Sequence, residues 1–95
     1  MICLDPMMNH GFVLNAKRTR KSWKSCHMFS DTNSRGELFD MAEAIGLKKD
    51  WLQKSRLGIW HFDLIQSRRA AAIKNGAVEL TRKEASEIWK KIKTT

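Results

Sequence analysis

The chain has 95 residues, of which 42% are hydrophobic and 29% are charged. This length supplies apolar side chains for one core, so we expect a single domain over residues 1–95. Its uncharged apolar runs fall far short of the roughly 20 residues that a membrane helix needs, so no membrane partner is expected. The formal net charge of +8 instead predicts attraction to polyanions, which include nucleic acids, phosphorylated small molecules and acidic protein surfaces.

The first predicted strand covers residues 1–4 and stops at Asp5-Pro6, since proline cannot extend a paired strand. Residues 6–24 then predict a basic loop that is mobile without a partner. Its charge and its aromatic residues are typical of a nucleic-acid contact, and an ordinary solvated loop is the alternative. The expected contact residues are Lys17, Arg18, Arg20 and Lys21.

Residues 23–29 predict a second strand, with Cys26 and Met28 on one face and His27 and Phe29 on the other. A helix over residues 35–45 follows. Ser34 and Glu37 form a capping-box pattern at its start, and Gly46 provides the left-handed stop. Its apolar stripe consists of Leu38, Met41, Ala42 and Ile45.

The rest of the chain alternates strands and helices. Residues 59–65 predict a strand with Ile59, His61 and Asp63 on one face and Trp60, Phe62 and Leu64 on the other. Ser67 is expected to cap a helix over 68–75 that ends at Asn75-Gly76, and a short strand over 77–80 follows. Thr81 and Glu84 open a last helix over 82–93, whose buried stripe is Ala85, Ile88, Trp89 and Ile92.

The predicted order ββαβαβα indicates a small, single-domain, layered α/β fold with a partly parallel sheet. Cys3 and Cys26 are too few for a disulfide framework, so we expect them to be reduced and buried. The first residues lack a secretion signal, which favours a cytoplasmic location.

Several short motifs occur in a defined order between Cys26 and Leu80. They are Cys26-His27-Met28-Phe29-Ser30-Asp31-Thr32, Glu37-Leu38, Ile45-Gly46-Leu47, Trp51, His61-Phe62-Asp63, Ser67-Arg68-Arg69 and Gly76-Ala77-Val78-Glu79. In this order they resemble the bacterial and phage family catalogued as domain of unknown function 4031. The resemblance implies the fold and a candidate site but no reaction, and a phage-encoded member would act in the host cytoplasm.

His27, Asp31, His61 and Asp63 are the candidate catalytic residues, and Asp5 can join them where the first strand ends. One interpretation is a shared polar cleft at an edge of the sheet. The alternative is structural, with half-buried histidines and with aspartates that cap the following helices. A metal site is a third interpretation, but no residues are assigned as metal ligands, and the cofactor is unknown.

Ser67, Arg68 and Arg69 form a second candidate site, a phosphate pocket, because two arginines in the first turn of a helix oppose its dipole unless an anion is bound. Solvated arginines that pair with acids are the alternative. The basic residues late in the last helix suit its dipole, and we read them as a solvated face.

The function expected first is a small binding protein that recognises a phosphate-bearing ligand, either a nucleic acid or a nucleotide. An enzyme that acts on a nucleotide or phosphodiester through the His/Asp cluster is an alternative. A second alternative is a phage inhibitor that docks on an acidic host protein.

Overall fold

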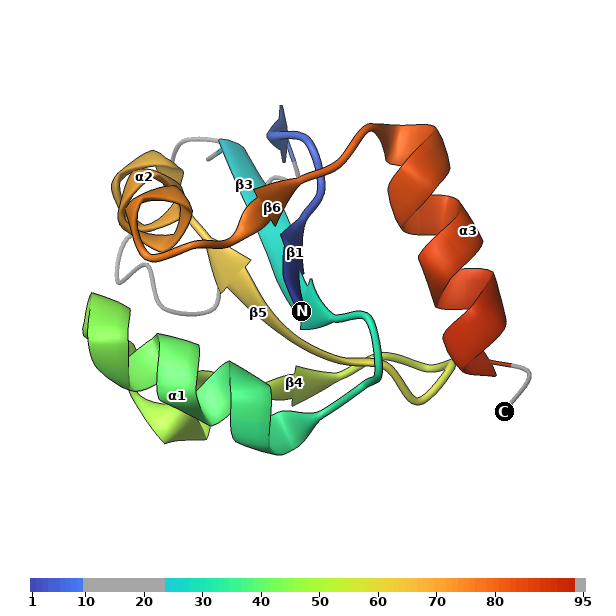
Figure 1. Ribbon diagram of the computed structural model, residues 1–95, viewed down its shortest axis with the longest axis horizontal. Helices are drawn as coiled ribbons and strands as arrows, with labels where there is room; N and C mark the ends of the chain where they lie inside the picture. The colour runs from blue at the N-terminus through green and yellow to red at the C-terminus, as the bar shows by residue number, and fades with distance from the viewer. Residues whose placement is uncertain (10–23, 94–95) are drawn as a thin grey trace.

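One mixed sheet and three α-helices make up the described part of the chain, which is residues 1–9 and 24–93 of a computed structural model (Figure 1). The strands are β1 (Ile2–Leu4), β2 (Met8–Asn9), β3 (Lys24–Ser30), β4 (Gln53–Lys54), β5 (Trp60–Leu64) and β6 (Val78–Glu79). The helices are α1 (Arg35–Ile45), the 3₁₀ helix η1 (Lys49–Trp51), α2 (Gln66–Lys74) and α3 (Arg82–Lys93).

The strands follow the order β4-β5-β3-β1-β6, and β2 pairs with the beginning of β3. β1 and β6 pair in parallel, and the other pairs are antiparallel. β5 and β6 run in the same direction, but β3 and β1 lie between them, so α2 carries the chain across the sheet. The fold is thus a small α/β domain with a partly parallel sheet, as the element order predicts.

The two faces of the sheet are covered unequally. α1 and α2 lie on one side, and α3 lies on the other (Figure 1). The larger apolar cluster contains Cys26, Met28, Phe62 and Leu64 from the first face, together with the predicted stripe of α1. A smaller cluster joins Cys3, Phe29 and Ile59 to the stripe of α3. The alternation predicted for β3 and β5 is therefore confirmed.

The helix ends agree with the sequence in part. Ser34 accepts a hydrogen bond from the Glu37 amide, and Gly46 adopts φ 77° after the last turn of α1. The Glu37 carboxylate does not return to Ser34; instead it accepts hydrogen bonds from the Ser30 hydroxyl and the Met1 amine. Both halves of the second capping box, between Thr81 and Glu84, are present.

The cap predicted at Ser67 is wrong. α2 begins one residue earlier, at Gln66, with Ile65 as its N-cap and no capping side chain. Ser67 therefore lies exposed within the first turn, where its hydroxyl is not in the capping position.

Three short elements were not predicted from the sequence: β2, η1 and β4. Each spans two or three residues, which is too short to show a hydrophobic period in the sequence. β2 falls within the predicted basic loop and pairs with β3, whereas residues 10–23 of that loop lie outside the described residues.

Cys3 and Cys26 are both buried and unbridged, as expected. Of the helices in the described ranges, none combines the length and the apolar character that a bilayer crossing requires.

Candidate functional site

His27, His61 and Asp63 come together on the face of the sheet that carries α3. His27 in β3 pairs in register with Asp63 in β5, and His61 lies two residues earlier on the same strand, so all three side chains share one face. Each residue has one potential metal-ligand atom, an imidazole nitrogen or a carboxylate oxygen, and these three atoms lie within 4.8 Å of one another. We call these three residues the His/Asp cluster.

Asp5 holds His27 from the neighbouring strand. Its Oδ1 accepts the His27 backbone N–H at 2.6 Å, and its Oδ2 accepts the ring Nδ1–H at 2.7 Å. β1 ends just before Asp5, but the Asp5 backbone N–H still donates to the His27 carbonyl at 3.2 Å, and this contact brings the carboxylate against His27. Because a carboxylate only accepts, the pair fixes the proton of the His27 ring on Nδ1.

The other members of the cluster are also held in place. His61 is buried, and its Nδ1 donates to the Ile59 carbonyl at 3.1 Å. Asp63 Oδ2 accepts from Gln53 Nε2 at 2.7 Å, while its Oδ1 lies 3.7 Å from His27 Nε2. The two imidazoles meet edge to face with ring centroids 5.1 Å apart.

The environment shifts the pKa values of the two histidines in opposite directions. Burial lowers the pKa of His27, but the hydrogen bond and charge of Asp5, with the charge of Asp63, outweigh it and raise that pKa above its usual value. For His61, burial is the largest effect and lowers its pKa, and the neighbouring His27 lowers it further. His27 is therefore the more easily protonated of the two rings.

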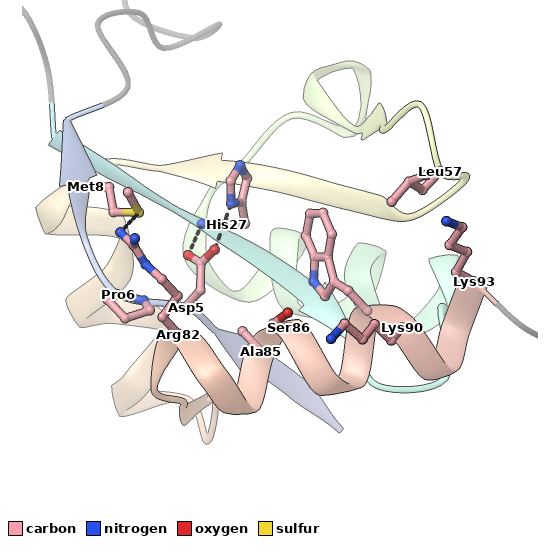
Figure 2. Close-up of a pocket in the computed structure, with 11 residues that line it drawn as sticks. Asp5, Pro6, Met8, His27, Leu57, Arg82, Ala85, Ser86, Lys90 and Lys93 are labelled. Carbon is pink, nitrogen blue, oxygen red and sulfur yellow. Dashed lines mark hydrogen bonds and ion pairs between the residues drawn. The ribbon is translucent and has the colours of Figure 1, made fainter.

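A cavity of about 440 Å³ lies between the sheet and α3, and His27 and Asp5 stand on its wall (Figure 2). We call it the α3 cavity. Trp89 also lines it, with its ring centroid 5.6 Å from that of His27. Figure 2 shows Arg82 toward one end of the helix and Lys90 and Lys93 toward the other.

The sequence predicts that Lys90 and Lys93 lie on a solvated face and that Trp89 is a core residue. The spacing of 82, 86, 89, 90 and 93 does place them on one side of a helix, and this signal could have revealed the cavity wall. Gln53, which holds Asp63, was missed because β4 was not predicted.

Asp31 does not join the cluster. Its carboxylate accepts the Met1 amine at 2.8 Å, after the end of β3. Asp31 is four residues beyond His27, which is about 13 Å along an extended chain, so its carboxylate does not reach the cluster.

Arg68 and Arg69 engage protein acceptors. Arg68 Nη1 donates to the Ile45 carbonyl at 2.6 Å, at the C-terminal end of α1. Arg69 Nη1 donates to Glu79 at 2.8 Å, and its Nη2 lies 3.3 Å from the Asp5 carbonyl oxygen. The geometry thus gives no support to a phosphate pocket at Ser67, Arg68 and Arg69.

Lys17, Arg18, Arg20 and Lys21, the predicted polyanion contacts, lie outside the described residues.

Comparison with known proteins gives one result. No curated protein and no solved structure matches the chain. A family model described as a protein of unknown function, DUF4031, matches residues 12–92, a range that contains His27, His61 and Asp63. The chain therefore belongs to the DUF4031 family.

Proposed function

We propose that the protein binds a phosphate-bearing ligand, a nucleic acid or a nucleotide, in the α3 cavity. The observation that carries this proposal is the placement of three cations, Arg82, Lys90 and Lys93, around a largely apolar cavity. Lysine and arginine are the usual partners of phosphate oxygens, and an apolar wall suits the face of a base.

The size and chemistry of the cavity support such a ligand. A volume of about 440 Å³ falls within the range of roughly 300–1,000 Å³ typical of small-molecule sites. The indole N–H of Trp89 is buried and meets no acceptor among the described residues. This donor exposes no surface to the cavity, so the support for the ligand comes from the volume and the apolar lining.

The basic segment of the sequence starts and ends beside this cavity. Asn9 and Lys24, which flank residues 10–23, pair in the β2–β3 ladder, and the neighbouring Met8 lines the cavity. In the sequence Lys17, Arg18, Arg20 and Lys21 stand between Asn9 and Lys24, and the described Met8 accepts a hydrogen bond from Arg82 of α3. This connection favours an extended polyanion, such as a single-stranded nucleic acid, over a lone nucleotide.

A salt titration tests the proposal. We expect a fluorescent single-stranded oligonucleotide to bind with a log–log salt slope of about −0.7 for each phosphate contact. The double substitution Lys90→Gln/Lys93→Gln should flatten that slope by about 1.4. The matched control, Lys48→Gln/Lys49→Gln, removes the same charge from exposed residues at η1 and should leave the slope nearly unchanged.

A steric variant separates the cavity from general attraction to positive charge. Ser86 is exposed and lines the cavity, so Ser86→Phe fills part of it without changing the charge. We expect this variant to weaken binding. Equal affinities for wild type, Ser86→Phe and Lys90→Gln/Lys93→Gln would rule out the cavity as the site. Binding to acidic proteins alone would favour the docking alternative.

An enzyme acting on the bound nucleotide or phosphodiester is a second candidate, favoured by the Asp5–His27 pair on the cavity wall. A carboxylate that orients an imidazole is a common arrangement for proton transfer. His27→Gln should then abolish turnover of a phosphodiester while the ligand still binds. Binding without turnover by the wild-type protein would leave the binding function alone.

A further inference from the structure

The His/Asp cluster has the composition of a transition-metal site. Two imidazoles and one carboxylate form the donor set of many catalytic zinc centres and of related iron sites. We infer that His27, His61 and Asp63 bind one divalent transition-metal ion of the zinc class. This inference does not depend on the phosphate ligand, because all three donors belong to the sheet.

The distances are close to those such an ion requires. Zinc bonds of roughly 2.0–2.2 Å in a tetrahedral site place neighbouring ligand atoms about 3.4 Å apart. His27 Nε2 and Asp63 Oδ1 are 3.7 Å apart, and the complete set lies within 4.8 Å. The third donor must therefore come closer by about 1.4 Å when an ion binds, and all three donors stand on the paired strands β3 and β5.

Each donor is also oriented by a group behind it. Asp5 accepts from Nδ1 of His27, the Ile59 carbonyl accepts from Nδ1 of His61, and Gln53 donates to the outer oxygen of Asp63. These bonds place the proton of each ring on Nδ1, which makes Nε2 the nitrogen suited to an ion. Metal-bound histidines nearly always have such a partner on the other nitrogen, so these contacts form an outer shell around the site.

The carboxylates at the cluster favour a cation, whereas Arg82, Lys90 and Lys93 on the cavity wall oppose one. Asp63 contributes one carboxylate directly, and Asp5 lies behind His27. Calcium and magnesium prefer a shell made of oxygen atoms, whereas two imidazole nitrogens select zinc, cobalt, nickel or iron. Three protein donors leave at least one position of a tetrahedral ion for water or a ligand. His27 also lines the α3 cavity, so the ion would stand at its wall.

A bound ion and a transferred proton compete for the same nitrogen of His27. His27 therefore cannot bind the ion and transfer a proton through this nitrogen at the same time. A titration with metal alone measures ion binding without any phosphate ligand.

The test uses the full chain after removal of metals with a chelator. Titration with Co²⁺, followed by visible absorption and then by Zn²⁺ competition, should show one equivalent bound. Asp5→Asn should weaken binding by about 10–100-fold through the outer shell, and Asp63→Asn and His61→Gln should weaken it further. Asp50→Asn makes the same chemical change at an exposed residue of η1 and should leave affinity unchanged.

Two results would overturn the inference. One is the absence of stoichiometric binding to the wild-type chain. The other is binding that the cluster variants do not weaken, or a cobalt spectrum with thiolate charge-transfer bands, which would place the ion on cysteine. If the variants unfold, ring ¹⁵N chemical shifts of the wild-type protein decide, because Zn²⁺ must move the Nε2 resonances of His27 and His61.

Discussion

Substitution of Arg68 distinguishes the phosphate site expected from the sequence from the contact observed in the fold. In the structure its guanidinium donates to the Ile45 carbonyl at 2.6 Å, next to Gly46. This carbonyl belongs to the C-terminal end of α1, where the helix leaves acceptors without partners and where a cation is favourable. Arg68 thereby ties α2 to α1 over the larger apolar cluster.

Arg68→Met keeps much of the apolar stem and removes this contact. A hydrogen bond to a charged group contributes about 1.5–3 kcal/mol, and the half-buried position of Arg68 argues for the lower end. A loss of about 1.5 kcal/mol corresponds to a decrease in Tm of roughly 6–12 °C for a domain of this size. Arg56→Met, at an exposed position in the turn before β5, is the control for loss of charge and should change Tm little.

Thermal unfolding with and without phosphate provides the assay. We expect Arg68→Met to lower Tm equally in phosphate and in chloride of equal ionic strength. The reasoning fails if Arg68→Met is as stable as Arg56→Met in chloride. It also fails if phosphate selectively stabilises the wild type and this effect disappears in Arg68→Met, since the sequence-based phosphate site would then be correct.

Three further predictions concern the thiols, the last helix and the cluster. Burial raises the pKa of Cys3 to about 11 and that of Cys26 to about 12, so iodoacetamide at pH 8 should modify neither until the chain is unfolded, as mass spectrometry would show. Thr81→Ala removes the N-cap of α3 and should lower the free energy of unfolding by about 1 kcal/mol in urea titrations, whereas Thr81→Ser should not. His61→Leu should change stability by less than about 1 kcal/mol, because added apolar burial offsets the bond lost to Ile59. A loss of several kcal/mol would identify His61 as a structural residue.

The elements with a clear period could be predicted from the sequence. The stripe of α1, its Gly46 stop and the two-faced alternation of β5 follow from local spacing and agree with the structure. β2 and β4 could not be predicted, because two residues carry no period and their pairing depends on partners far along the chain.

The candidate site was predictable where residues share one strand face and not where they follow a strand. His61 and Asp63 are two residues apart on β5, so the pleat alone brings them together. Asp31 follows β3, and there the direction of its side chain depends on the turn and on the Met1 amine. The destinations of Arg68 and Arg69 depended on how α2 packs against α1 and β6, which local spacing does not determine.

The unequal covering of the sheet links its stability to the site. The face under α1 and α2 is filled with apolar side chains, whereas the face under α3 combines a small apolar cluster with His27, His61 and Asp63. Burial of polar groups is unfavourable unless each has a partner, and Asp5, the Ile59 carbonyl and Gln53 supply those partners from the chain itself. The side chains are therefore oriented before any ligand arrives, and binding does not bear the cost of ordering them. Because α3 packs through one stripe and lines the cavity through the adjacent side, a change that loosens this helix should weaken binding even when every cavity residue is retained.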